Sequence, residues 1–240
     1  MNSLTTDSFF DGELHIKQEA AGYRFSLDAV LLAGHTGPLG NERLLDLGTG
    51  CGIIPLILTY RNPNITAYGI EIQQDLAELA ISNVIANHMQ NRITVMQQDL
   101  RDIKPVMTGG PMDLIVCNPP YYKPNTGRLN PDAQRAIARH ELRVDLADLL
   151  LAVRRMLRTS GRFIIIYTAE RIVELLSRMQ LAGIEPKYIR LIHSQLDAEA
   201  KLVLVDGIKN ARPGARLGPP LVIYDTRGEY SKEVQRMFIP

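Results

Sequence analysis

The chain has 240 residues, of which 45% are hydrophobic and 22% charged, and its formal net charge is +1 at pH 7. This composition is that of an ordinary globular protein and excludes a disordered chain, and the lack of any apolar run of about 18 residues excludes a membrane span. Residues 1–11 lack the basic start and apolar stretch of a secretory signal, so we expect one folded domain in the cytoplasm without a membrane partner.

The N-terminal part of the chain predicts a short helix ahead of the first strand. Ser26 is a typical helix-capping residue, and the apolar residues that follow it continue the helix through Leu32. We expect residues 1–35 to form a segment packed on the main domain. That domain would cover residues 36–240, with a C-terminal extension from about residue 207.

From residue 44 onward, strand-like apolar runs alternate with segments of helical spacing. The predicted strands cover residues 44–47, 66–71, 93–97, 114–117, 162–167, 188–193 and 202–206. Helix-length segments such as 75–87 and 146–157 separate most of them, which predicts an α/β fold with a doubly wound, mostly parallel sheet. The last two strands are separated by residues 194–201, a short segment that permits an antiparallel hairpin near the C-terminus.

Two irregular segments interrupt this pattern. Residues 122–141 form a long polar connection, and connections of this length inside a compact domain are usually functional or disordered. The tail after Asn210 is rich in glycine and proline and predicts an extended loop before a short apolar run at 221–224. The two cysteines, Cys51 and Cys117, have no metal-ligand spacing, so we expect free thiols and no metal site.

A glycine-rich turn follows the strand at 44–47. The segment from Asp46 to Gly52 reads Asp-Leu-Gly-Thr-Gly-Cys-Gly, which places an acidic residue and a Gly-x-Gly-x-Gly turn between a strand and a helix. Glycines permit backbone conformations closed to other residues and allow a ligand to approach the main chain. A sharp turn without a ligand would also use glycine. We assign to cofactor binding the turn residues Asp46, Gly48, Thr49, Gly50 and Gly52.

Two further carboxylates follow neighbouring predicted strands. Glu71 ends the strand at 66–71, where its carboxylate could accept hydrogen bonds from ribose hydroxyl groups, and Asp99 follows the strand at 93–97, where it could accept from an adenine amino group. Each alone could be a helix cap or a turn residue. Together with the glycine turn they would line one crevice at the carboxyl edge of the sheet. We include their neighbours Ile72 and Leu100 in the cofactor site.

The glycine spacing differs from that of nicotinamide dinucleotide sites. Those sites favour Gly-x-Gly-x-x-Gly because a pyrophosphate sits against the helix start, whereas here the third glycine comes one position earlier. The carboxylate of Asp46 would oppose a pyrophosphate but suits a ligand that carries an ammonium group. S-adenosylmethionine has an amino group, a ribose and an adenine, so it is the cofactor that we expect.

The most specific motif is Asn118-Pro119-Pro120-Tyr121, directly after the strand at 114–117. An exocyclic amino nitrogen is a poor nucleophile because its lone pair is delocalised into the ring. The side-chain carbonyl of Asn118 and the backbone carbonyl of Pro119 could accept its two hydrogens, and the prolines would hold these acceptors in place. Tyr121 could stack on the planar acceptor group. Asn118 is also expected to contact the cofactor, and the alternative for the motif is a rigid strand exit without chemistry.

These motifs resemble those of class I methyltransferases of the small methyltransferase domain group, over roughly residues 44–206. The segment 22–33 and the tail are also similar to those of the bacterial tRNA1(Val) adenine-N6 methyltransferases. The resemblance implies a Rossmann-like fold, S-adenosylmethionine as methyl donor, and methylation of N6 of the adenosine next to the anticodon of a tRNA. It also implies that the segment 22–33 lies beside the cofactor.

The motif alone leaves other acceptors open, because guanine N2 and the side-chain amide of protein glutamine also present a conjugated NH₂ group. Only 43 residues precede Leu44, too few for the helical domain usual in glutamine methyltransferases, and 240 residues leave little room for a DNA target-recognition region. Outside this enzyme class, a nicotinamide-dependent oxidoreductase and a non-catalytic RNA-binding protein are the alternatives.

Basic residues favour RNA as the partner. Between Tyr122 and His140 there are four basic residues against Asp132 alone. With two tyrosines they form the expected substrate-binding set, Tyr121, Tyr122, Lys123, Arg128, Arg135 and Arg139. The tail from Asp206 to Pro220 adds Lys209, Arg212 and Arg216 against Asp206, and we expect these residues near the same carboxyl edge of the sheet. A solvated charged loop is the alternative. We expect a monomer or a weak dimer.

Overall fold

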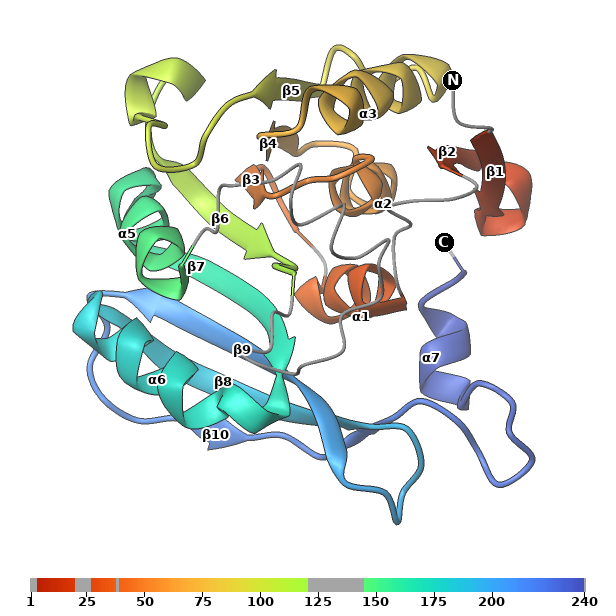
Figure 1. Cartoon of the computed structure of the whole chain (residues 1–240), viewed down its shortest axis with the longest axis vertical. Coiled ribbons are helices and arrows are strands. Elements are labelled where there is room, and N and C mark those ends of the chain that lie inside the picture. The colour runs from red at the N-terminus through yellow and green to blue at the C-terminus, as the bar shows by residue number, and fades with distance from the viewer. Residues whose placement is uncertain (1–3, 20–26, 38, 121–144, 240) are drawn as a thin grey trace, which may run out of the picture.

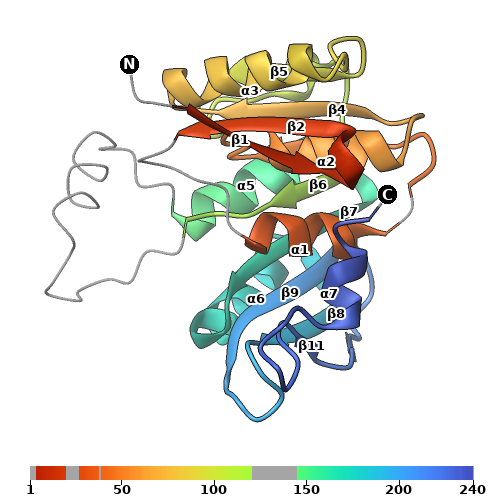
Figure 2. The ribbon, with the colours of Figure 1, turned by 90° about the vertical axis from the view of Figure 1, so that its right-hand side faces the viewer.

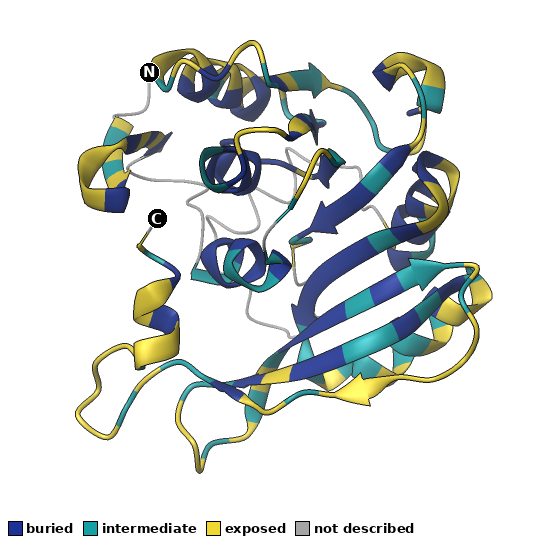
Figure 3. Cartoon of the chain, turned by 180° about the vertical axis from the view of Figure 1, so that it is seen from behind, coloured by how far each residue is buried: buried dark blue, intermediate teal, exposed yellow. Residues whose placement is uncertain are grey.

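The computed structural model of the chain describes residues 4–19, 27–37, 39–120 and 145–239. Its centre is a twisted sheet with helices packed against both faces (Figure 1). The strands of this sheet are mostly buried, whereas the surface loops and most of the C-terminal helix are exposed (Figure 3). No helix within the described ranges is long and apolar enough to span a membrane.

The central sheet is mostly parallel. Its principal strands are β3 (Arg43–Leu47), β4 (Thr66–Glu71), β5 (Ile93–Gln97), β6 (Met112–Cys117), β7 (Leu157–Thr168), β8 (Ile184–His193) and β9 (Ala200–Lys209). They lie in the order β8-β9-β7-β6-β3-β4-β5, and β9 is antiparallel to both of its neighbours. The predicted fold class is therefore confirmed, including the antiparallel hairpin near the C-terminus.

Helices cover the sheet on both sides because the strands present apolar side chains to both faces. One hydrophobic cluster contains residues of α1 (Leu27–Thr36), α2 (Ile53–Arg61) and α3 (Gln74–Ala86). The other contains residues of α5 (Leu146–Met156) and α6 (Ile172–Leu181). Alternate residues of β7 divide between them, since Ile164 and Ile166 belong to the first cluster and Phe163 and Ile165 to the second. Two short 3-10 helices, η2 (Pro105–Thr108) and η3 (Ala169–Arg171), lie in connections.

The strand order creates a switch point at β3. This strand pairs with β4 on one side and with β6 on the other, and all of these pairings are parallel. The chain therefore leaves the carboxyl ends of β3, β4, β5 and β6 at a single edge. In open α/β sheets, ligands bind outside this edge at the point where the strand order reverses.

Residues near the N-terminus form a hairpin that the sequence did not predict. It consists of β1 (Leu4–Phe9), a 3-10 turn η1 (Phe10–Gly12) and β2 (Leu14–Glu19). The side chains of Leu14 and Ile16 are fully buried in the same cluster as α2, and β2 also contacts α3. Figure 2 shows the hairpin lying alongside these two helices.

The C-terminal tail is more structured than an extended loop. Two short strands, β10 (Arg216–Leu217) and β11 (Leu221–Val222), pair in parallel with β8, and a final helix, α7 (Lys232–Arg236), follows. A side chain at Gly34 would place its Cβ 2.5 Å from Cγ of Met237, so the glycine allows the tail to pack closely on α1. Ser231 caps α7 by accepting a hydrogen bond from the N–H of Val234.

The expectation that the basic residues of the tail lie near the carboxyl edge of the sheet is wrong. An antiparallel β9 runs away from the carboxyl edge, and Ile208 pairs with Arg162 near the start of the parallel part of β7. The Lys209 ammonium group donates to the backbone oxygens of Arg154 and Leu157 at this opposite edge. The ammonium group of Lys187, near the start of β8, donates to the backbone oxygen of Arg212, and Arg216 pairs with Tyr188 in the sheet. These residues therefore do not form a rim around the glycine turn.

Candidate active site

The structure brings the predicted cofactor residues to one edge of the sheet. The glycine turn follows β3, Glu71 ends β4, Asp99 lies two residues after β5, and Asn118 directly follows β6. These four strands are neighbours in the order β5-β4-β3-β6. Tyr121 and the remaining predicted substrate-binding residues, Tyr122, Lys123, Arg128, Arg135 and Arg139, lie outside the described residues.

The glycine turn is fixed to the end of β4 by its own backbone. The N–H groups of Gly48 and Thr49 both donate to the carbonyl oxygen of Ile70, each at 2.9 Å. Gly48, Gly50 and Gly52 have φ angles of 78°, 56° and 85°, in the left-handed region that favours glycine. The Thr49 side chain is buried and lies against Gly69. A Cβ added at Gly69 would be 2.9 Å from Cγ2 of Thr49. The turn is thus held in shape before any ligand binds.

Glu71 joins the glycine turn to the start of α3. One oxygen of its buried carboxylate accepts from the N–H of Gly50 at 2.9 Å, and the other accepts from the N–H of Gln73 at 3.0 Å. Gln73 is the residue directly before α3, so this contact holds the approach to the helix. Each carboxylate oxygen has a further lone pair that a ribose hydroxyl could use.

Asp46 is a fully buried carboxylate in β3, and neither of its oxygens has a hydrogen-bond partner within the described part of the chain. Burial raises the pKa of this carboxyl to about 7, and the negative charge of Glu71 adds to the effect. The nearby Thr49 hydroxyl lowers the pKa in part, although its position falls short of hydrogen-bond geometry. Because an unpaired buried carboxylate is costly, the site fits a ligand with a positively charged amino group.

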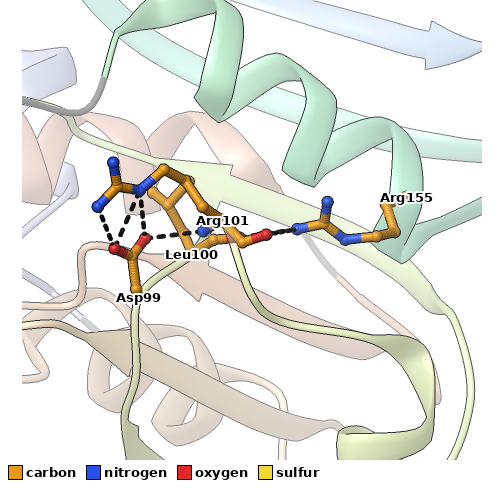
Figure 4. Close-up of polar contacts among 4 residues, drawn as sticks. All are labelled: Asp99, Leu100, Arg101 and Arg155. Atoms are coloured by element: carbon orange, nitrogen blue, oxygen red, sulfur yellow. Dashed lines mark hydrogen bonds and ion pairs between the residues drawn. The ribbon is translucent and has the colours of Figure 1, made fainter.

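Asp99 is held by its neighbour Arg101, as Figure 4 shows. The Arg101 guanidinium donates to both carboxylate oxygens, with both Nε distances at 3.0 Å, and the Arg101 backbone N–H donates to Oδ1 at 2.9 Å. The hydrogen bond from the Arg101 side chain lowers the pKa of Asp99, which keeps this carboxylate ionised. Arg101 therefore orients the carboxylate that we assign as the acceptor for the adenine amino group. An adenine bound there would share this carboxylate with Arg101.

A second arginine fixes the loop that contains Asp99. Arg155 of α5 donates from Nη2 to the carbonyl oxygens of Leu100 and Arg101, each at 2.9 Å (Figure 4). Its Nε donates to the carbonyl oxygen of Ile103 at 2.6 Å. These contacts join segments more than 50 residues apart in the sequence. No local pattern in the sequence indicates them, and they were not predicted.

The strand register places the Asn118 motif next to the glycine turn. Leu47 pairs with Cys117, so Gly48 and Asn118 leave neighbouring parallel strands at the same level. The Cys117 thiol donates to the Leu47 carbonyl at 3.1 Å, and burial raises its pKa well above the usual value. Asn118 and Pro119 are half-buried, and Pro120 is exposed. A ligand on the glycine turn would therefore lie beside the Asn-Pro-Pro segment.

Within the described ranges, no group of three or more His, Cys, Asp or Glu side chains is arranged to hold a metal ion. The polar groups at this edge instead suit an organic ligand. They offer an unpaired buried carboxylate at Asp46, acceptors at Glu71 and Asp99, and a glycine backbone that a ligand can approach.

The chain is similar to known methyltransferases. The family model described as methyltransferase small domain matches residues 28–176, more than half of the chain. A protein of Porphyromonas gingivalis named tRNA1(Val) (adenine(37)-N6)-methyltransferase is 31% identical, over 99% of this chain and 95% of its own length. A protein of the same name from Tolumonas auensis is 28% identical, over 94% of this chain and 92% of its own length.

Among solved structures, a predicted O-methyltransferase of Agrobacterium tumefaciens has a similar fold. Its TM-score is 0.71 at 22% sequence identity, and the match covers 88% of this chain and 94% of that one. The chain belongs to the methyltransferase small domain family and is an S-adenosylmethionine-dependent methyltransferase.

Proposed function

We propose that this enzyme methylates the exocyclic N6 of an adenine in tRNA, at the adenosine that follows the anticodon. The observation that carries the proposal is the pairing of Leu47 with Cys117, which sets Asn118 beside the glycine turn. The relatives named tRNA1(Val) (adenine(37)-N6)-methyltransferase support this acceptor, because the alignment with the Porphyromonas protein covers nearly the full length of both chains.

In this proposal the turn and its neighbours hold the cofactor. Asp46 attracts the ammonium group, Glu71 accepts hydrogen bonds from the ribose, and Asp99, oriented by Arg101, accepts from the adenine amino group. The backbones of Gly48 and Gly50 allow close approach. When bound, S-adenosylmethionine supplies an electrophilic methyl group on its sulfonium.

Asn118 and Pro119 act on the acceptor nitrogen. Their two carbonyl oxygens accept the hydrogens of the target NH₂ group, which favours a more tetrahedral nitrogen and makes its lone pair available. The rings of Pro119 and Pro120 restrict the backbone, so these acceptors are positioned before the RNA arrives. No protein base is needed before transfer, because the proton leaves once the nitrogen has become cationic.

The segment after Pro120 completes the proposed substrate site. Tyr121 would stack on the adenine, as aromatic side chains do with bases taken out of a stack. Tyr122 would extend this platform. The basic side chains of Lys123, Arg128, Arg135 and Arg139 would contact RNA phosphates, which predicts that activity falls as salt concentration rises.

A methyl-transfer assay with three acceptor pools tests the proposal. Tritiated S-adenosylmethionine is incubated with the enzyme and with unmodified total tRNA, total rRNA or a mixture of release factors, and labelled RNA is digested for nucleoside mass analysis. We expect label in tRNA, recovered as N6-methyladenosine. Label recovered as N2-methylguanosine, or label only in protein, would contradict the proposal and identify the guanine or glutamine acceptor instead.

A further inference from the structure

The end of α3 pairs with the N-terminal hairpin through two asparagine side chains. The Asn83 carboxamide accepts from the N–H of Lys17 and donates to its carbonyl oxygen, both at 2.9 Å. One helical turn later, Asn87 makes the same pair of contacts with His15, at 2.9 Å and 2.6 Å. The two carboxamides thus hydrogen-bond to the backbone of β2 along the edge that does not pair with β1, as the backbone of a neighbouring strand would.

Only one of these two carboxamides also reaches the cofactor turn. The Asn83 amide nitrogen donates to the carbonyl oxygen of Cys51, within the glycine turn, at 2.9 Å. The second donation of Asn87 goes instead to the backbone oxygen of Asn83 in the same helix, at 2.8 Å. Asn83 is completely buried, and Asn87 is partly exposed.

The contact at Cys51 lies at a sensitive point of the turn. An added Cβ at Gly52 would be 3.3 Å from Cβ of Ala80, so α3 packs directly against the turn one helical turn before Asn83. The earlier part of the turn is held by Ile70 and by Glu71, at the end of β4. Asn83 therefore fixes the part of the turn that leads into α2.

We propose that Asn83 is a positioning residue for S-adenosylmethionine, and that it couples the docking of the N-terminal hairpin to the shape of the glycine turn. A residue without a side-chain amide at this buried position would leave the carbonyl oxygen of Cys51 without this donor, and the glycine turn would be free to shift. The inference depends on the family's cofactor and not on the identity of the methyl acceptor.

Asn87 supplies a matched control, because it makes the same contacts with β2 but does not reach the turn. We compare the full-length Asn83→Ala and Asn87→Ala variants in three measurements. These are the Kd for S-adenosylhomocysteine by calorimetry, the thermal unfolding midpoint, and amide hydrogen exchange of residues 48–53 without ligand. In addition, the KM for S-adenosylmethionine and kcat are measured with an active acceptor.

The expected result is a separation between stability and cofactor binding. Both variants should lower the unfolding midpoint, since both lose buried or partly buried hydrogen bonds to β2. Asn83→Ala should raise the Kd and the KM about tenfold, leave kcat within about threefold, and speed exchange in the turn. Asn87→Ala should keep the Kd within about twofold of the wild type.

Equal effects of the two variants on the Kd, or an unchanged Kd in Asn83→Ala, would overturn the proposal. If Asn83→Ala does not fold, Asn83→Leu, compared with Asn87→Leu, provides the test. Leucine has about the size of asparagine and fills the buried position without a charge, but it has no N–H to donate to Cys51. Asn83→Leu should therefore weaken binding as the alanine variant does, and a wild-type Kd in this variant would also overturn the proposal. Because the ligand binds without an acceptor, a wrong assignment of the RNA substrate would leave these outcomes unchanged.

Discussion

The carboxylate of Glu71 and the backbone N–H of Gly50 are joined by a hydrogen bond of 2.9 Å. This bond links the end of β4 to the middle of the glycine turn, and the other carboxylate oxygen holds the start of α3 through Gln73. One side chain therefore shapes the turn and also presents the acceptor that we assign to the ribose. A change at this position should affect both folding and cofactor binding.

Glu71→Gln should weaken cofactor binding at least about tenfold and lower the free energy of unfolding by about 2 kcal/mol. The physical reason is that an amide has one acceptor oxygen, so one of the two backbone N–H groups would face an NH₂ group. Calorimetry with S-adenosylhomocysteine and urea unfolding measure the two effects. Glu78→Gln, at an exposed position of α3 where the carboxylate contacts only the side chain of Gln74 among the hydrogen bonds described, is the control and should change neither value.

The raised pKa of Asp46 predicts a pH dependence of stability. The carboxyl has a pKa of about 7 in the folded protein against 3.8 for the ordinary group, so between these values the folded state binds a proton that the unfolded state has lost. Stability from this group is therefore fully present below about pH 4 and is lost as the pH rises to about 7. In Asp46→Asn the dependence disappears. Between pH 4 and pH 8, the free energy of unfolding of Asp46→Asn should therefore rise by about 4 kcal/mol relative to that of the wild type.

Urea unfolding at pH 4, 6 and 8 without ligand measures this shift. A saturating concentration of S-adenosylhomocysteine tests the role of the carboxylate, because its ammonium group should stabilise the ionised form and reduce the pH dependence of the wild type. If ligand stabilises the wild type equally at pH 5 and pH 8, Asp46 does not contact the ammonium group.

The sequence predicted the elements whose signals are local. Residues 66–71 and 93–97 have the bounds of β4 and β5, because each is an apolar run that ends at a polar turn. The glycine turn follows from its residue types, since Gly48, Gly50 and Gly52 all adopt positive φ. The site edge follows as well, because parallel strands bring their carboxyl ends together.

The remaining features depend on contacts between distant residues. The hairpin edge at β2 is paired by Asn83 and Asn87, whose partners lie 66 and 72 residues away. The hydrogen bonds from Arg155 to the loop after β5 also join residues that are far apart in the sequence. The tail was misplaced because its expected position did not follow from the predicted hairpin, since an antiparallel β9 ends at the amino edge of the parallel strands, where Lys209 lies. The helix α7 was missed because five residues are too few for a helical pattern.

Asn118→Ala should reduce kcat at least about 100-fold while the Kd for S-adenosylhomocysteine stays within about threefold. The variant loses the side-chain carbonyl that accepts a hydrogen of the target amino group, whereas the glycine turn on the neighbouring strand remains. Single-turnover methyl transfer and calorimetry separate the two effects. Asn64→Ala, at an exposed position, should behave like the wild type. A folded Asn118→Ala protein that no longer binds the cofactor would contradict this division of roles.

Arg155→Ala should raise the Kd for the cofactor about fivefold and lower the free energy of unfolding by about 1–2 kcal/mol, because three backbone oxygens of residues 100–103 lose their donor. Arg155→Lys should not restore binding, since an ammonium group lacks the planar fork that reaches Leu100 and Ile103 together. The neighbouring Arg154→Ala is the control. Its guanidinium donates to the carbonyl of Ala182, away from this loop, so its Kd should equal that of the wild type. Equal binding by Arg155→Ala and the wild type would mean that the loop after β5 keeps its position without Arg155, or that it does not contact the adenine.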